Sequence, residues 1–275
     1  MLGFSVLELG TLAGAVMIAA IFAGILAGLL GVGGGIVLVP VLFWLLSMTD
    51  FPPALSMHMA VATSLMTIAF TSVSSARSHK KRGSLDRYIL RLWAPGIVLG
   101  ALCGGISAKF VNADILRGIF GGIALIVALN MAWTTPFVWR DKLPDSRVTN
   151  ISIAWITGVL SALMGIGGGT LGVPTLVGFG TEIRRAVGTA SAFGFLIAVP
   201  AVLGFIWAGW SVPNRPWASI GYVNVPAALL ILPFTIAFAP FGAELSHRIS
   251  TDWVKRCFAI FLGLTALRML MGLFS

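Results

Sequence analysis

Gly31-Val-Gly-Gly-Gly35, with Val39-Pro40 close behind it, lies within a long apolar run that holds no charged residue from position 9 to 49. A straight helix over that run would be about 60 Å long, whereas the hydrocarbon core of a bilayer is about 30 Å thick. Glycine inside a helix costs about 1 kcal/mol relative to alanine, and proline removes a backbone donor. We therefore predict that the run breaks at these glycines.

The same motif occurs a second time, 134 residues later. Gly165-Ile-Gly-Gly-Gly169 precedes Val173-Pro174 inside the uncharged run 148–181, which as a straight helix would measure about 50 Å. Two further matches keep the same order: 60–64 with 186–190, and 106–110 with 245–249. We predict a duplicated chain with halves 1–140 and 141–275, which meet in the charged linker 140–147.

The composition places the chain in a membrane. Of its 275 residues 58% are hydrophobic and 10% are charged, whereas soluble domains carry about 25% charged residues. The fold class predicted is an all-α polytopic membrane protein with about eight full spans and two short broken or re-entrant helices after the glycine motifs. The lipid bilayer is thus one expected partner. The net charge of the chain is +9. In a membrane protein such an excess of Lys and Arg usually marks cytoplasmic loops, so it does not indicate a nucleic-acid partner.

The basic residues discriminate between two topologies. If the runs at the glycines cross only once, ten Lys and Arg residues fall on one side and seven on the other. If each run crosses twice, fourteen fall on one side and only Lys109, Arg117 and Arg215 on the other. The positive-inside rule favours the second arrangement, with both chain ends outside and the halves inverted relative to one another. Its difficulty is that 36–49 and 170–181 are short for crossings, at about 21 and 18 Å.

The distribution of polar residues favours an anionic ligand. All nine acidic residues lie outside or at the edges of the apolar runs, which argues against a cation transporter and an obvious proton relay. Helix N-termini and successive glycine N–H groups can hold an anion, with hydroxyls as further donors. The candidate substrate-binding residues are Gly31, Gly33, Gly34, Gly35, Thr63, Ser64, Gly165, Gly167, Gly168, Gly169, Thr170, Thr189 and Ser191.

Structural roles remain open for these residues. Glycines often allow helices in a bilayer to pack closely, and serine or threonine often bonds the backbone of its own helix. Because the glycine motif occurs twice, within runs too long for one crossing, we favour a substrate site for the glycines over packing alone. The hydroxyls are weaker candidates.

Enzyme signatures were not found. No Gly-x-x-x-x-Gly-Lys-Ser/Thr or Gly-x-Ser-x-Gly motif occurs, and His58, His79 and His247 show no metal-ligand spacing. We expect no enzymatic activity, no cofactor and no metal.

The glycine motif with its trailing Val-Pro, its second-half copy and the Ala-Val-Ala-Thr-Ser run at 60–64 resemble the TauE/SafE sulfite exporter family, part of the toluenesulfonate uptake permease group. The resemblance covers essentially the whole chain. It implies a multi-pass transporter of the bacterial inner membrane for small sulfur-containing anions: sulfite, sulfonates such as sulfoacetate, or related oxyanions. The second half has Thr189-Ala190-Ser191 where the first has Thr63-Ser64, so the two hydroxyl sets differ.

The hypothesis is therefore a secondary transporter that works by alternating access between two inverted halves. Two other classes stay open: an anion channel, and a non-transporting membrane subunit of a larger complex. The direction of transport, the coupling ion and the oligomeric state are not readable from the sequence.

Overall fold

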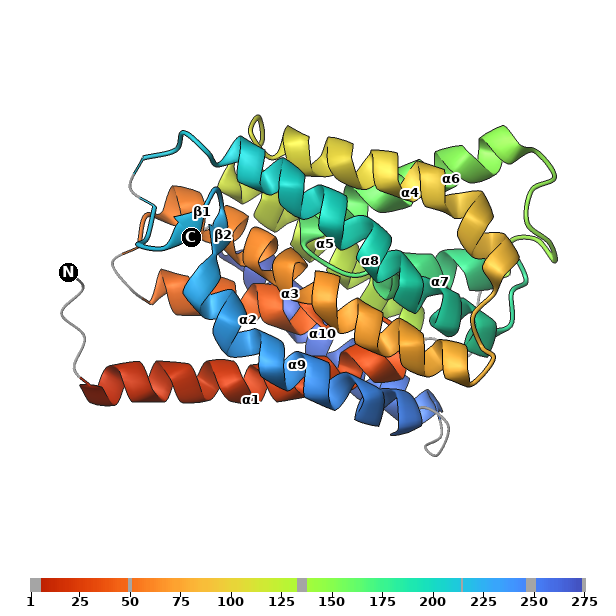
Figure 1. Ribbon diagram of the computed structural model, residues 1–275, viewed down its shortest axis with the longest axis horizontal. Helices are drawn as coiled ribbons and strands as arrows, with labels where there is room; N and C mark the ends of the chain where they lie inside the picture. The colour runs from red at the N-terminus through yellow and green to blue at the C-terminus, as the bar shows by residue number, and fades with distance from the viewer. Residues whose placement is uncertain (1–5, 49–50, 133–137, 214, 246–250, 274–275) are drawn as a thin grey trace.

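The computed structural model describes residues 6–48, 51–132, 138–213, 215–245 and 251–273 (Figure 1). Ten helices and one short pair of strands lie in this part of the chain. Their bounds are α1 Val6–Leu30, α2 Gly35–Ser47, α3 Pro53–Lys81, α4 Arg87–Ser107, α5 Ala113–Ala132, α6 Arg147–Met164, α7 Gly169–Gly178, α8 Ile183–Ala208, β1 Ser219–Ile220, β2 Val223–Asn224, α9 Val225–Leu245 and α10 Thr251–Met271. The prediction of an all-α polytopic fold is confirmed.

Eight helices have 18 residues or more, and α2 and α7 have only 13 and 10. Seven of the long helices are apolar enough to cross a membrane over their described residues, and the described apolar part of α10 is the shorter segment Ala259–Met271. This matches the expected eight spans and two short helices. The chain is a multi-pass membrane protein.

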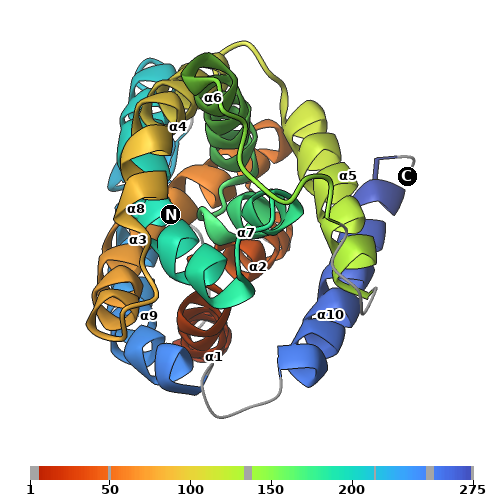
Figure 2. The same cartoon turned by 90° about the vertical axis from the view of Figure 1, so that its right-hand side faces the viewer.

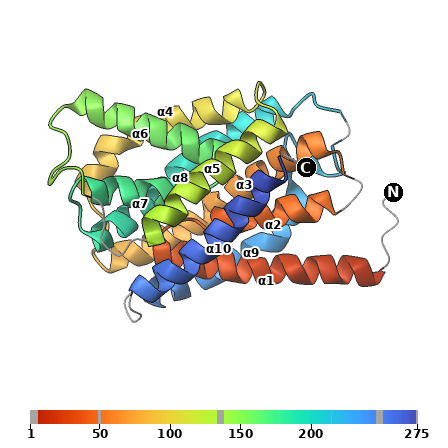
Figure 3. The same ribbon diagram turned by 180° about the vertical axis from the view of Figure 1, so that it is seen from behind.

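Each glycine motif reverses the chain. Figures 1 and 3 show that α2 runs back toward the end of the molecule at which α1 begins, and that α7 runs back toward the start of α6. The two over-long apolar runs are therefore helical hairpins whose second arm is about half the length of a span. Each hairpin begins and ends on the same side.

This reversal determines the position of the loops. Helices α3, α5, α7 and α9 end, and α4, α6, α8 and α10 begin, at one end of the molecule, whereas α1 begins and α10 ends near the other (Figure 1). This arrangement is the second of the two topologies considered from the sequence, in which fourteen Lys and Arg residues lie on one side of the membrane. Of these fourteen, Arg248 lies outside the described residues.

Glycine and alanine let the long helices approach closely. A Cβ added at Gly100 of α4 would lie 2.1 Å from the carbonyl oxygen of Trp155 in α6, and one at Gly28 of α1 would lie 1.9 Å from that of Ala239 in α9. Because lipid provides no hydrophobic effect between helices, the van der Waals contact that such close approach allows contributes to helix association. The pairs α4–α6 and α1–α9 are accordingly among the most extensively packed in the bundle.

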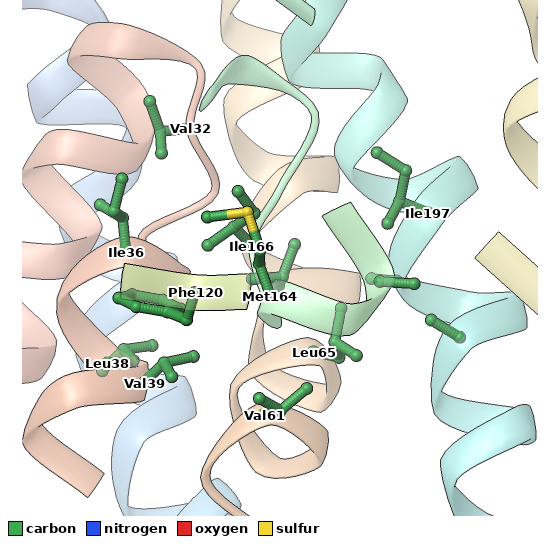
Figure 4. Close-up of a cluster of buried hydrophobic side chains, with 14 of the residues drawn as sticks. Val32, Ile36, Leu38, Val39, Val61, Leu65, Phe120, Met164, Ile166 and Ile197 are labelled. Carbon is green, nitrogen blue, oxygen red and sulfur yellow. The ribbon is translucent and has the colours of Figure 1, made fainter. Parts of the chain in front are cut away.

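The short helices lie inside this frame. Seen end-on, α2 and α7 lie in the middle, between the pair α5–α10 on one side and the helices α3, α4, α8 and α9 on the other (Figure 2). A buried apolar cluster surrounds them, with Val32, Ile36, Leu65, Phe120 and Ile166 among its members (Figure 4).

Candidate functional site: the crossing of the two glycine breaks

The two glycine breaks contact each other in the middle of the bundle. The N–H of Gly167 donates to the carbonyl oxygen of Val32 at an N···O distance of 3.1 Å. A Cβ added at Gly33 would lie 3.1 Å from the Cα of Gly167. Residues 31–35 and 165–169 therefore form one structural unit, which we call the crossing.

Several glycines of the crossing have no room for a side chain. A Cβ on Gly35 would lie 2.3 Å from the carbonyl oxygen of Gly165, and a Cβ on Gly169 would lie 2.3 Å from that of Gly31. Real Cβ atoms do not come this close to backbone oxygen, and the opposing backbone cannot easily move. Close packing, which the sequence left open, is thus one role of these glycines in the structure.

The chain reversals also need glycine. Gly34, which precedes α2, has φ 81°, and Gly165, which ends α6, has φ 68°. Residues with a side chain rarely adopt this left-handed conformation. At Gly165 it terminates α6 and sends the chain into the crossing, where α7 begins four residues later.

Both short helices begin at the crossing, α2 at Gly35 and α7 at Gly169. The first N–H groups of a helix have no acceptor within that helix, and its N-terminus carries the equivalent of about half a positive charge. Among the side chains whose burial the structure describes, no Asp or Glu is buried, and among the described residues no group of three His, Cys, Asp or Glu side chains could hold a metal ion. The positive ends of α2 and α7 therefore meet, and none of the carboxylates that the structure describes is buried beside them.

The two candidate threonines form matching contacts with the backbone. Thr63 Oγ1 accepts a hydrogen bond from the N–H of Asn224 at 3.0 Å, and Thr189 Oγ1 accepts one from the N–H of Asp86 at 2.9 Å. Asn224 and Asp86 in turn accept hydrogen bonds from N–H groups in the first turns of α9 and α4. Each threonine thus attaches one half of the chain to the start of a helix in the other.

The remaining candidate hydroxyls differ in their partners. Ser64 Oγ donates to the carbonyl of Gly165 at 2.8 Å, and Ser191 Oγ donates to that of Gly188 at 2.7 Å. Thr170 Oγ1, in the first turn of α7, is buried and has no hydrogen-bond partner. A buried hydroxyl without a partner is energetically unfavourable, so it marks a position where a ligand can contribute.

Sequence reasoning missed Ser161. Its Oγ is also buried without a partner, and it lies one turn before the second break, on the same hairpin as Thr170. The sequence feature that could have identified it is a serine four residues before Gly165, where the second glycine motif begins. The corresponding position in the first half, by the 134-residue offset, is Ala27, so the first hairpin has no counterpart of the Ser161 hydroxyl.

Two other polar side chains, Arg185 and His58, contact residues outside the crossing. Arg185 forms an ion pair with Asp86 between the starts of α8 and α4. His58 stacks on Tyr222 with ring centroids 4.7 Å apart, and its Nε2 lies 2.9 Å from the carbonyl of Val111. The ion pair and the ring stacking each join the two halves of the chain, whereas the contact with Val111 lies within the first half.

Comparison with known proteins identifies the chain's relatives. The family model described as sulfite exporter TauE/SafE matches residues 16–269, which include most of the first hairpin, all of the second and the whole crossing. The chain belongs to the TauE/SafE family. The resemblance inferred from the glycine motifs is thereby confirmed. No solved structure gives a significant match.

Relatives of this TauE/SafE protein occur in distant organisms. A probable membrane transporter protein of Haemophilus influenzae is 33% identical over 90% of this chain and 94% of its own length. Probable membrane transporter proteins of Methanocaldococcus jannaschii and Bacillus subtilis are each 27% identical, over 90% and 93% of this chain and 91% and 96% of theirs. Family and relatives together make this protein a membrane transporter of the cell membrane.

Proposed function

We propose that this protein is a secondary transporter for small sulfur-containing oxyanions, such as sulfite or a sulfonate, which it binds at the crossing. The observation that carries the proposal is that the N-termini of two short helices meet inside the bundle, with no buried carboxylate among the side chains whose burial the structure describes. The family described as sulfite exporter supports the substrate class.

The electrostatics favour an anion. Two N-termini present roughly one positive charge between them. In a medium of low dielectric constant that charge interacts strongly with a ligand, and backbone N–H groups replace part of the anion's hydration. Sulfite and sulfonate oxygens each accept several hydrogen bonds, so they match donors that arrive from two helices. The Thr170 and Ser161 hydroxyls add donors from one side.

We further propose that the halves 1–140 and 141–275 are inverted repeats that alternate access to the crossing. Five described helices lie in each half. Helices α1, α3 and α5 run in one direction along the molecule, and α6, α8 and α10 run in the opposite direction (Figures 1 and 3). The packing of α4 on α6 corresponds to that of α9 on α1, and the Thr63–Asn224 bond corresponds to Thr189–Asp86.

The test is anion flux into proteoliposomes that contain the purified protein. Sulfite, thiosulfate, sulfate, sulfoacetate and taurine are compared with acetate as a carboxylate control. We expect saturable flux for at least one sulfur anion and none for acetate. Flux that rises linearly with concentration at a high rate would replace the carrier by a channel. A folded protein with no flux for any of these anions would contradict the proposal and favour a non-transporting subunit.

A further inference from the structure

A groove of about 860 Å³ opens between α3 and α9, away from the crossing. It lies at the end of α3 that leads into the most basic loop of the chain. Its lining residues come from these two helices alone: Phe70, Val73, Ser74, Arg77, Ser78, Lys80, Lys81, Ile236 and Pro240. Because α3 and α9 belong to different halves, the groove follows a junction between them.

The inner part of the groove is apolar. Phe70 is 48% exposed and Ile236 is 37% exposed, and both belong to helices that are long and apolar enough to cross the membrane. Pro240 has no N–H for the carbonyl of Ile236 one turn earlier, and Ser74 Oγ donates to that carbonyl instead at 3.3 Å. The backbone polarity in the floor is thereby satisfied within the protein, which leaves a surface suited to an acyl chain.

The outer part of the groove is basic. Arg77, Lys80 and Lys81 are all exposed, and the residues that line the groove include no Asp or Glu. The nearest acid along α9, Glu244, lies one turn beyond Pro240 and outside the lining. Three positive charges above an apolar floor are complementary to a ligand with an anionic head and an apolar tail.

We propose that this groove binds an anionic phospholipid, with its phosphate among Arg77, Lys80 and Lys81 and an acyl chain along Phe70 and Ile236. From residue 70 to residue 81 a helix rises about 16 Å, enough for a headgroup, the glycerol and the upper part of a chain. Lysine and arginine near a membrane surface each contribute about 1 kcal/mol to attraction for anionic lipid. This site is independent of the transported anion.

The repeat provides an internal comparison. By the 126-residue offset, Arg77, Lys80 and Lys81 correspond to Leu203, Ile206 and Trp207 of α8. The same stretch of helix thus folds with apolar residues in the second half. A helix at this place in the repeat therefore does not need the three charges in order to form. They occur in α3, at the end of the molecule where the basic residues gather, and not in α8.

The experiment measures lipid retained by the purified full chain in native mass spectrometry, after addition of phosphatidylglycerol or phosphatidylcholine. We expect one phosphatidylglycerol to be retained at least about tenfold more strongly than phosphatidylcholine. The triple change Arg77→Gln, Lys80→Gln and Lys81→Gln is expected to abolish that preference. Arg77→Lys with Lys80→Arg and Lys81→Arg keeps the charges and is expected to keep the preference, as is Arg87→Gln with Arg91→Gln and Lys142→Gln, which removes three exposed charges outside the groove.

Other results would overturn the proposal. A triple glutamine variant that keeps its preference for phosphatidylglycerol would exclude the groove as the site, and equal loss in the Arg87, Arg91 and Lys142 variant would indicate nonspecific attraction. Competition by inorganic phosphate at millimolar concentration would show that a free anion, rather than a lipid, occupies the basic residues. Thermal unfolding of each variant confirms that a fold is present before lipid is measured.

Discussion

Thr170, in the first turn of α7, carries a buried hydroxyl that has no hydrogen-bond partner. Changing it to valine removes the hydroxyl and keeps the shape of the side chain. We expect the KM for the transported anion to rise about tenfold or more, since a hydrogen bond to a charged group contributes about 1.5–3 kcal/mol. Thermal stability is expected to stay the same or increase, because a buried unsatisfied group disappears. Kinetics in proteoliposomes and a melting curve measure the two effects.

Thr175→Val is the matched control for this change. Thr175 lies on the same short helix, and its Oγ1 donates to the carbonyl of Leu171 at 2.6 Å. Its replacement is expected to leave the KM unchanged. If Thr170→Val also leaves the KM unchanged in a folded protein, the Thr170 hydroxyl does not contact the anion.

Gly35 tests the packing role of the crossing. In Gly35→Ala the new Cβ meets the carbonyl oxygen of Gly165, so the hairpins must separate, and we expect the free energy of unfolding to fall by about 1–3 kcal/mol. Gly122 of α5 has open space around its Cβ position, and Gly122→Ala is expected to be neutral or stabilising by up to about 1 kcal/mol. Denaturation in detergent compares the two. Equal stability of both variants would mean that the crossing tolerates side chains.

At the scale of elements, the polar contacts between the two halves are expected to contribute different amounts to stability. Thr189→Val leaves the Asp86 N–H without its acceptor, which is expected to cost about 1–3 kcal/mol of stability, and Thr63→Val is expected to behave alike at Asn224. Arg185→Gln removes an ion pair in which the arginine is 57% exposed, so we expect a loss below about 1 kcal/mol that salt reduces further.

Unfolding curves at low and high salt distinguish the contribution of the threonine hydrogen bonds from that of the ion pair. Salt-independent losses for both threonine variants, beside a small salt-sensitive loss for Arg185→Gln, are the expected pattern. If the arginine variant proved to be the least stable of the three, the ion pair of Arg185 with Asp86 would stabilise the contact between α8 and α4 more than the Thr189 hydroxyl does.

The elements themselves could be predicted to different degrees. The long helices follow from runs of apolar residues, which any bilayer-spanning segment requires. The breaks follow from Gly31–Gly35 and Gly165–Gly169, since local conformational cost does not depend on the rest of the fold. The partners of Thr63 and Thr189 could not be predicted, because Asn224 and Asp86 are far from them in sequence and the contacts exist only after the helices pack.

At the scale of the whole molecule, the orientation in the membrane is testable. Lys142 is exposed in the segment before α6, and Trp217 is exposed between α8 and β1. The start of α6 and the end of α8 lie at opposite ends of the bundle (Figure 1). In a background with Cys103→Ala and Cys257→Ala, we expect Lys142→Cys to react with an impermeant maleimide only from the cytoplasmic side and Trp217→Cys only from the outer side. Labelling of both from one side of right-side-out vesicles would contradict the arrangement in which fourteen basic residues face the cytoplasm.

The sequence by itself determined the membrane environment, the helical class, the position of both breaks and the family, because these depend on composition and on motifs that are local in the chain. It also raised the possibility that the glycines serve packing. Only the tertiary structure decided that the two breaks cross, that Gly35 and Gly169 each lie against the other hairpin, and that Thr170 and Ser161 are left without partners. The physical reason is that close backbone approach and unsatisfied hydrogen bonds are properties of surfaces brought together from distant parts of the chain, which no local pattern records.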